Sequence, residues 1–223
     1  GKNGRKMTAL TTIASSRDAL LCRRDKVAYA RGMRKQLEDS ALMLRYREGD
    51  IAAFETLYRR HNDSLYRYLL RLSANRQTAE DVFQDAWSKV IKARQNYRPT
   101  AKFSTYLFRV AHNCFIDYVR RNKRHGQETQ TEPDLSPDQG AAPEQLAERH
   151  LARRRLDNAL KTLPDEQRDA FLLHEEGGLS IDDIGFVTGA NRETAKSRLR
   201  YAVAKLKSAM ITANATDKSI YDE

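Results

Sequence analysis

The chain has 223 residues, of which 40% are hydrophobic and 31% are charged, and its formal net charge is +10 at pH 7. This composition permits one large or two small domains with a buried core, and it favours a well-solvated helical protein. Its two cysteines exclude a disulfide framework, and the lack of an apolar run of about 18 residues predicts no membrane insertion. The basic balance favours a polyanionic partner, either a nucleic acid or an anionic membrane surface.

The N-terminal segment differs in composition from the rest. Residues 1–32 are rich in Thr, Ser and Arg, show weak periodicity, and precede a methionine at Met33. We expect residues 1–37 to be a disordered extension, or to include translated sequence ahead of a true start at Met33. A targeting segment is a further alternative, although the segment lacks the apolar stretch and cleavage site of a secretory signal.

Residues 38–125 form a first block with helical periodicity. Asp50 is predicted to cap a helix over residues 51–72, where apolar side chains recur every three or four positions. A capping box that begins at Thr78 is predicted to open a second helix. Ser104 is predicted to cap a third. The block therefore indicates a small helical domain, and its Lys and Arg residues outnumber its acidic ones.

A break separates this block from a second one. Residues 126–142 carry Gly, Pro, Ser, Gln and Thr, few large apolar side chains, and an excess of acidic over basic residues. This segment cannot offset the entropy of ordering, which predicts a flexible linker. The second helical block follows at residues 143–210, with a tail at 211–223. Since no stretch alternates as a strand, we predict an all-α fold of two small helical domains joined by this linker.

The sharpest local pattern lies near the end of the second block. Ser180 is predicted to cap a short helix over residues 181–188, and Asn191 to cap a longer one, with Gly189 at the turn between them. Gly185 is expected to let the two helices approach closely. The pattern predicts a helix-turn-helix, whose second helix meets base edges in the major groove with its N-terminal part.

Basic residues gather on the outer face of that second helix. Arg and Lys donate to guanine O6 and N7 or to phosphate, and Ser bonds to either, so this face is expected to read DNA. The alternative is an ordinary helical hairpin with a solvated basic face. The outward positions are Arg192, Glu193, Lys196, Ser197 and Arg200.

The helix-turn-helix resembles that of a known family. The run Gly-Leu-Ser-Ile-Asp-Asp-Ile at residues 178–184, the glycine at Gly189 and the run Thr-Ala-Lys-Ser-Arg-Leu at residues 194–199 resemble the sigma-70 family. They are most similar to its small extracytoplasmic-function (ECF) group. Residues 160–168 resemble the segment that opens the same domain in that group.

The first block resembles the same family independently. Residues 79–87 resemble its polymerase-binding helix, and residues 103–113, followed by 117–121, resemble its helix for the −10 promoter element. Two motifs in the family's order, with a linker of suitable length, identify the chain as a member over residues 41–210. The resemblance implies a sigma factor that directs promoter-specific initiation by recognising the −10 and −35 elements and promoting melting.

The resemblance also implies partners and contact residues. The partners are core RNA polymerase, through its β′ and β subunits, double- and single-stranded promoter DNA, and an anti-sigma factor; the implied localisation is cytoplasmic. The polymerase contacts are Asp81, Gln84 and Asp85. The −10 contacts are Tyr97, Lys102, Phe103, Tyr106, Arg109, Asn113, Arg120 and Arg121. The −35 contacts are Arg192, Lys196, Ser197 and Arg200.

Several of these residues have a purely structural alternative. Trp87 is expected to be a core aromatic, and Tyr106 to be either a core aromatic or a stacking platform for melted bases. Tyr106 also stands where Trp is common in the family. Small residues such as Gly185 and Ala195 stand where larger ones are usual, which predicts a second domain of marginal stability on its own.

Two other functions compete with the sigma-factor interpretation. A one-component helix-turn-helix regulator would explain the second block but not the first. An interaction protein that sequesters a partner would leave the basic face incidental. The sequence carries no phosphate loop, nucleophile elbow or zinc-hydrolase pattern, so we expect neither an enzyme nor a cofactor. His112 and Cys114 lack a second ligand pair, and we expect no metal site.

Overall fold

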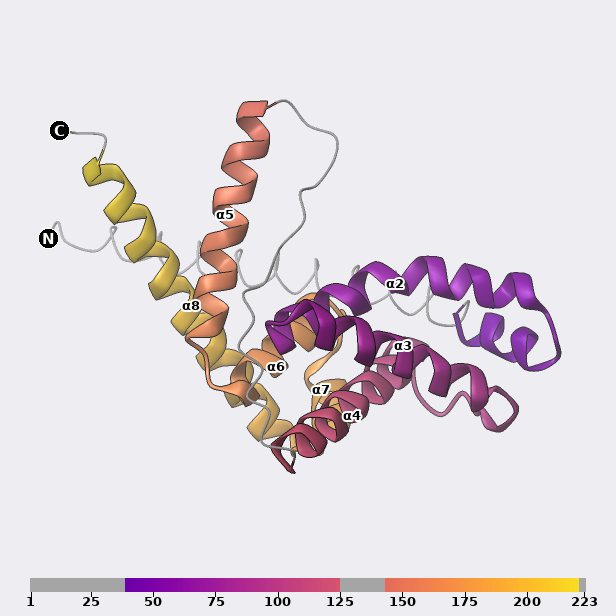
Figure 1. Cartoon of the computed structure of the whole chain (residues 1–223). Coiled ribbons are helices and arrows are strands. Elements are labelled where there is room, and N and C mark those ends of the chain that lie inside the picture. Colours follow the sequence, from indigo (N-terminus) through magenta and orange to yellow (C-terminus); the bar gives the residue numbers. More distant parts are fainter. Residues whose placement is uncertain (1–38, 125–142, 221–223) are drawn as a thin grey trace, which may run out of the picture.

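The computed structural model describes residues 39–124 and 143–220, and every regular element within these ranges is helical (Figure 1). The all-α prediction is therefore confirmed for this part of the chain. The predicted N-terminal extension and linker lie outside the described residues. In the described part, no helix is both long and apolar enough to cross a membrane.

The first part of the molecule is a small bundle. Residues 39–47 are helical. They lead into α2 (Ile51–Ser73), α3 (Arg76–Lys92), the short 3₁₀ helix η1 (Arg94–Asn96) and α4 (Phe103–Arg124). α3 packs against both α2 and α4.

The helix starts in this bundle confirm one expected cap and correct two. The Asp50 side chain accepts the Ala53 backbone N–H at 3.1 Å, as expected of an N-cap. The cap of α3 is not at Thr78: Asn75 accepts the Thr78 N–H at 2.8 Å, because the helix already begins at Arg76. α4 likewise begins at Phe103, which puts Ser104 inside its first turn and makes it no cap.

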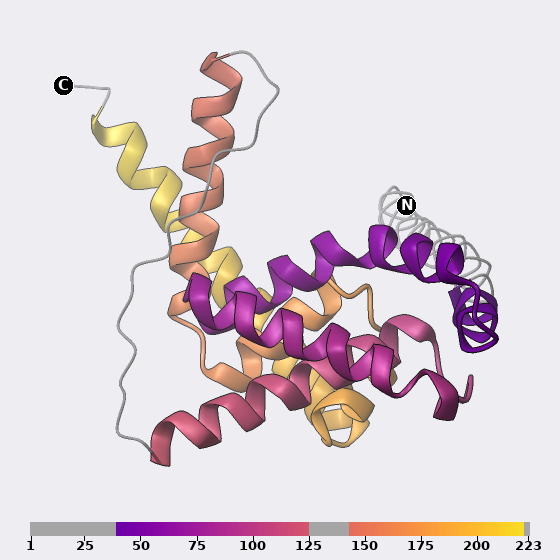
Figure 2. The ribbon, with the colours of Figure 1, turned by 45° about the vertical axis from the view of Figure 1, so that its right-hand side comes forward.

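The second part contains the remaining four helices. They are α5 (Pro143–Lys161), α6 (Asp165–Glu175), α7 (Ile181–Thr188) and α8 (Arg192–Ile220). Pro143 opens α5, and Pro164 precedes the first turn of α6, where a missing N–H costs little. α5 and α6 both pack on α8, and the far ends of α5 and α8 project away from the rest (Figures 1 and 2). α8 continues to Ile220, beyond the predicted end at residue 210.

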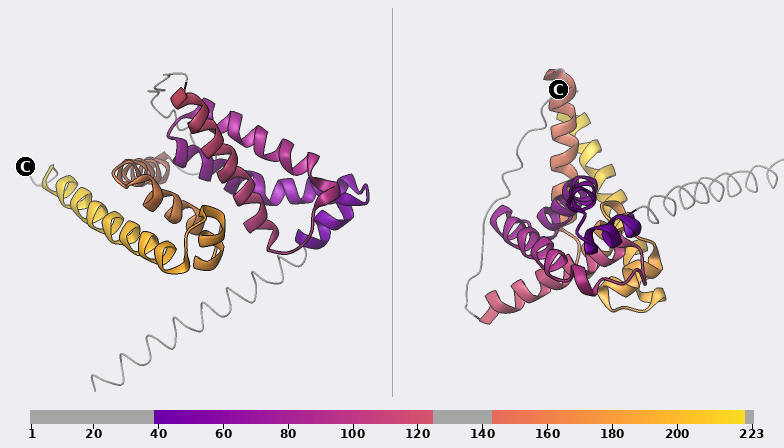
Figure 3. Two further views of the ribbon diagram at one scale, coloured as in Figure 1. Left: turned by 90° about the horizontal axis from the view of Figure 1, so that it is seen from below. Right: turned by 90° about the vertical axis from the view of Figure 1, so that its right-hand side faces the viewer.

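The two parts share one hydrophobic core. α6 packs against α2, and α7 lies along α4. In the left view of Figure 3, α6 and α7 lie on the side of the α5–α8 part that faces the first bundle. Buried side chains run from Leu65, Tyr68 and Phe108 in the first part to Leu172 and Leu173 in the second. The second part thus gains apolar burial from the first, beyond what its own helices supply. Its marginal stability in isolation stays a prediction.

Candidate DNA-binding and partner surfaces

The turn between α7 and α8 has the predicted helix-turn-helix chemistry. Ser180 and Asp183 form a reciprocal capping box at the start of α7. Gly189 ends that helix in the left-handed region, with φ of +69°, which favours glycine. A Cβ on Gly185 would lie 2.8 Å from the Ala190 carbonyl oxygen, so only glycine allows this close approach. Asn191 accepts the Thr194 N–H at 2.8 Å and caps α8.

The outer face of α8 is open to solvent. Arg192, Lys196 and Arg200 are exposed, and Ser197 is half-buried. The Arg192 guanidinium pairs with Asp182 of α7, and the Lys196 ammonium lies 3.8 Å from Glu193. These partners belong to the same domain and are exposed themselves. The cations therefore stay accessible to a polyanion.

The exposed face of α3 carries the three residues expected to contact polymerase. Asp81, Gln84 and Asp85 are all exposed. Gln77 donates to the Asp81 carboxylate at 3.0 Å, and Asp85 lies 3.9 Å from Arg121 of α4. Such exposed pairs contribute little to stability, so these carboxylates remain free to exchange partners.

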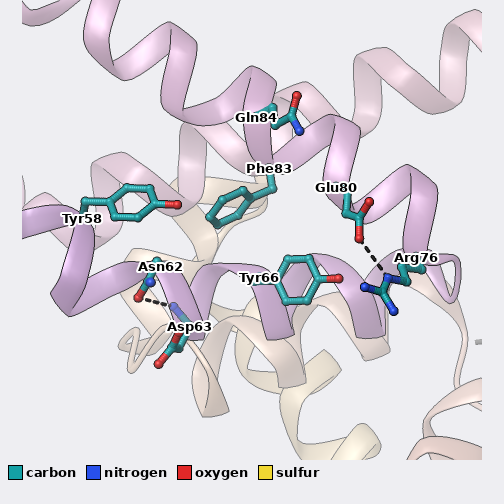
Figure 4. Close-up of a pocket in the computed structure, with 8 residues that line it drawn as sticks. All are labelled: Tyr58, Asn62, Asp63, Tyr66, Arg76, Glu80, Phe83 and Gln84. Carbon is teal, nitrogen blue, oxygen red and sulfur yellow. Dashed lines mark hydrogen bonds and ion pairs between the residues drawn. The ribbon is translucent and has the colours of Figure 1, made fainter. Parts of the chain in front are cut away.

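A groove of about 520 Å³ runs between α2 and α3 beside these residues (Figure 4). Phe83 points into it between two tyrosines, with ring centroids 6.3 Å from Tyr58 and 5.8 Å from Tyr66. Glu80 and Arg76 pair at 2.9 Å at one end of the groove. The surface combines exposed aromatic faces with polar groups, a composition common at protein interfaces.

Trp87 is a core residue, as expected. It is 4% exposed, and its ring lies 5.7 Å from Phe54 in an edge-to-face arrangement and 5.0 Å from Tyr58. From the core, its ring packs against Tyr58 and Phe83, which line the α2–α3 groove. Trp87 therefore takes no part in the exposed face of α3, which consists of polar residues.

The residues expected at the −10 element divide into an outer and an inner group. The outer group lies along α4: Arg109, Asn113, Arg120 and Arg121 are exposed, and Lys102 and Tyr106 are half-buried. The inner group is Tyr97 and Phe103, which are 4% and 0% exposed. These two rings lie in the core of the first bundle and offer no face to DNA in this structure.

The inner group forms an aromatic cluster that holds the loop before α4. The centroid of Tyr106 lies 5.3 Å from that of Tyr97 and 6.2 Å from that of Phe103, and His61 lies 5.3 Å from Phe103. Aromatic pairs at these separations add to the stability gained by burial. The cluster thus holds the half-buried Tyr106 ring in one position, with one edge of the ring at the surface.

Sequence reasoning missed a group of residues that connect the two parts. Asp183 of α7 accepts a hydrogen bond from the Thr105 hydroxyl at 2.9 Å and lies 3.1 Å from the Lys102 ammonium. Burial raises the pKa of this carboxyl, but hydrogen bonds from Ser180, Thr105 and the lysine outweigh it and hold the pKa below its usual range. The Arg109 guanidinium stacks 4.0 Å from the centroid of Phe186, also on α7.

A second connection is buried between α2, α4 and α6. The Tyr68 hydroxyl donates to Asp169 at 2.8 Å, and the other oxygen of that carboxylate lies 3.1 Å from Nδ1 of His112. Burial raises the pKa of Tyr68 well above its usual value, and the neighbouring carboxylate raises it further, so the hydroxyl remains a donor. An acidic residue directly before the apolar run of α6 was the available sequence signal for this contact.

A third connection is made by two arginines of α2. Arg67 and Arg71 both donate to the Glu176 carboxylate, the former at 2.7 Å. Arg71 also donates to Asp157 of α5 at 3.2 Å. Burial raises the pKa of Asp157 above its usual value, although both Arg71 and Arg153 lower it.

Comparison with known families matches both parts of the chain. Residues 57–125 match the family model described as sigma-70 region 2, and residues 153–206 match the model described as sigma-70 region 4. Together these matches cover more than half of the chain. Region 2 contains the outer −10 group and the exposed face of α3, and region 4 contains the helix-turn-helix.

Several known proteins are similar over about three quarters of this chain. The ECF RNA polymerase sigma factor SigE of Mycolicibacterium smegmatis is 36% identical over 163 residues, which cover 71% of this chain and 63% of that relative. CarQ, an RNA polymerase sigma factor of Myxococcus xanthus, is 32% identical, with 74% and 93% covered. The ECF RNA polymerase sigma factor SigM of Mycobacterium tuberculosis is 33% identical, with 78% and 86% covered.

Two solved structures share the fold. CnrH, solved in complex with the cytosolic domain of CnrY, has a TM-score of 0.59 and 24% identity, covering 79% of this chain and 98% of that one. The sigma factor RpoE of Bartonella quintana, solved with the anti-sigma factor NepR, has a TM-score of 0.60 and 24% identity, covering 72% and 98%.

Proposed function

Because the chain belongs to the ECF group of the sigma-70 family, and therefore directs RNA polymerase to promoters without being a catalyst itself, we propose how its three surfaces share this work. The exposed face of α3 binds the polymerase, α4 binds the −10 element, and α8 reads the −35 element. The observation that carries this division is the row of exposed cations on the capped N-terminal half of α8.

The polymerase surface is the exposed face of α3 with the adjoining groove. Asp81, Gln84 and Asp85 offer acceptors and an amide to the coiled coil of the β′ subunit. The Phe83 ring in the groove adds apolar area that becomes buried on docking (Figure 4). Aromatic anchors surrounded by polar groups supply most of the binding free energy at interfaces of this kind.

The −10 surface is the outer face of α4. Arg109, Arg120 and Arg121 bind phosphates, which fixes register without reading sequence. Asn113 and the loop that the Tyr97–Phe103 pair supports hold a base flipped out of the duplex. The surface edge of Tyr106 stacks on a melted base, and such capture offsets the few kcal/mol of unstacking, so melting needs no ATP.

The −35 surface is the N-terminal half of α8. Arg192, Lys196 and Arg200 reach the major groove, where a bidentate pair to guanine contributes about 1–3 kcal/mol of discrimination. Ser197 adds a contact to base or phosphate. The capping box and Gly185 hold α7 and α8 at the crossing that lets the second helix enter the groove.

We place the protein in the cytoplasm, at the nucleoid when polymerase-bound, because its polymerase and promoter partners are there. The β subunit is a further partner of region 4. Two fold relatives were solved with partner proteins, one of them an anti-sigma factor, and this supports an anti-sigma factor as a regulator of this chain.

Run-off transcription tests the proposal. Purified core polymerase and a supercoiled promoter library should give specific transcripts only when the chain is added. Lys196→Ala with Arg200→Ala should reduce transcription at least about tenfold, whereas Lys205→Ala, an exposed cation later on α8, should have little effect. Asp81→Lys with Asp85→Lys should abolish binding to core. A chain that binds duplex DNA but neither binds core nor supports transcripts would contradict the proposal.

A further inference from the structure

We propose that Tyr201 of α8 reads a thymine in the −35 element through the C5-methyl group of that base. This inference rests on the proposed function, since that function places the N-terminal half of α8 in the major groove. Tyr201 adds an apolar contact to a surface whose other proposed contacts are charged or polar. It therefore specifies one base of the promoter element that those contacts leave open.

Tyr201 lies on the same outer face of α8 as the −35 residues. It follows Ser197 by four positions and Arg200 by one, and side chains four apart are neighbours on a helix surface. A helix that presents Ser197 to base edges therefore brings Tyr201 to the groove one turn further along. The inner face of this stretch of α8 consists of buried small and apolar residues, namely Ala195, Ala202 and Leu206.

The Tyr201 ring does not contribute to the packing of the domain. It is 54% exposed, and it does not belong to the hydrophobic core that the two parts share. Within the described ranges, its ring contact is with the adjacent Arg200, whose guanidinium lies 5.1 Å from the ring centroid. A single exposed aromatic side chain is ordinary on a protein surface. This one, however, lies on the face that meets DNA, so the ring is available to a base.

The chemistry of the major groove selects the base. Every base edge there offers hydrogen-bond donors or acceptors, but only thymine adds an apolar group, its C5-methyl. An aromatic ring that covers this methyl removes apolar surface from water, which stabilises the complex in proportion to the area buried. Cytosine lacks the methyl and presents an amino group nearby, which the same ring would deprive of water. The ring therefore favours thymine over cytosine at one position.

Arg200 holds the ring ready for this contact. A cation placed over a ring attracts it, and the guanidinium also donates to the Tyr201 hydroxyl at 3.4 Å. Both side chains are exposed, so the pair restricts the ring without hiding it. A side chain that is already ordered loses less conformational entropy on binding. The guanidinium carries several donors, which leaves others for DNA while one engages the hydroxyl.

Selection of duplex DNA by the polymerase-bound chain identifies the base. Holoenzyme made from core polymerase and the native chain should enrich one −35 motif from a random duplex pool, with a constant thymine at one position. Tyr201→Ala should enrich the same motif without a preference at that position. Tyr201→Phe retains the ring and should keep the thymine. Ile211→Ala removes a more exposed apolar side chain later on α8 and should leave the whole motif unchanged.

Replacement of that thymine by deoxyuridine isolates the methyl group, because the two bases pair alike and differ in this group alone. The native holoenzyme should bind the deoxyuridine duplex about fourfold more weakly, as expected for one buried methyl. Tyr201→Ala holoenzyme should bind the two duplexes equally. Deoxyuridine that weakens both chains alike, or weakens neither, overturns the proposal. Since each chain is compared with itself, a smaller folded fraction of the variant could not imitate the expected result.

Failure of this inference is distinguishable from failure of the proposed function. A native holoenzyme that enriches no motif contradicts the proposed function, and the role of Tyr201 is then refuted with it. A motif that Tyr201→Ala enriches with its thymine preference intact contradicts the role of Tyr201 alone.

Discussion

The two DNA-facing helices, α4 and α8, present similar cations in different surroundings. Lys102 and Arg109, at the face of α4, contact side chains of α7 in the other domain, although Arg109 itself is exposed. Arg192 and Lys196 of α8 are exposed and form their ion pairs with Asp182 and Glu193 of their own domain. Affinity at the open face depends on its own contacts alone. Affinity at the covered face depends also on how often the domains separate, so the same substitution near either face has different consequences.

The largest expected effect comes from a substitution that disrupts the helix-turn-helix behind the exposed face of α8. Gly185→Val places a Cβ 2.8 Å from the Ala190 carbonyl oxygen, and the branched side chain enlarges the clash. We expect a loss of about 3 kcal/mol in the free energy of unfolding and loss of duplex binding, measured by urea denaturation and fluorescence anisotropy. Ala204→Val, at an exposed position of α8, should cost less than about 1 kcal/mol. Native-like duplex binding by Gly185→Val would contradict this account of the turn.

The next largest effect concerns the buried hydrogen bond between α2 and α6, which joins the two domains. Tyr68→Phe removes the hydroxyl that donates to the buried Asp169 carboxylate. The unfolding free energy should fall by about 2 kcal/mol, because a buried acceptor loses its partner. Single-strand binding should rise as the domains separate more often. Tyr58→Phe, at a partly exposed ring, is the matched control and should change neither quantity.

The pH dependence of stability should depend on Asp183. Its pKa is lower in the folded chain than in the unfolded one, so its contribution is present above about pH 4 and is lost as pH falls through the lowered value. The unfolding free energy measured from pH 6 to pH 2 should therefore drop more steeply in the native chain than in Asp183→Asn. At pH 7 this variant should lose about 1 kcal/mol of stability, since its hydrogen bonds to Thr105 and Lys102 weaken. Identical pH profiles for the two chains would refute this assignment.

The smallest expected effect concerns Asp157, whose pKa is shifted in the opposite direction to that of Asp183. The pKa of Asp157 is raised in the folded chain, so its ionised form is disfavoured by folding at neutral pH, and its stabilising share is complete only below its unfolded value. Asp157→Asn should leave the stability at pH 7 unchanged or slightly higher, because Arg71 keeps Glu176 as its partner. Glu176→Gln should be destabilising by comparison in the same thermal unfolding assay. The reverse order of the two variants would refute this.

The sequence predicted local structure better than packing between the two blocks. Caps at Asp50, Ser180 and Asn191, and the special glycines at the turn, follow from chemistry within a few residues, so they could be recognised. The starts of α3 and α4 were misplaced because several neighbouring polar residues can cap a helix. The burial of Tyr97 and Phe103 depends on residues distant in sequence.

The contact of α7 with α4 could not be predicted from either motif. Each motif was interpreted from its resemblance to a DNA-binding segment, and such a resemblance assigns a face to DNA whether or not another helix covers it. Asp183 could be predicted as part of a cap, but its hydrogen bond to Thr105 depends on how two separate domains dock.

Förster transfer between labels at Ile91→Cys of α3 and Ile211→Cys of α8, both exposed, tests the central claim most directly when the labelled chain is titrated with core RNA polymerase. The account predicts high transfer in the free chain and a saturable change to low transfer on binding, as α7 leaves α4 and the −10 face becomes accessible. The same high transfer in the polymerase-bound state would contradict it.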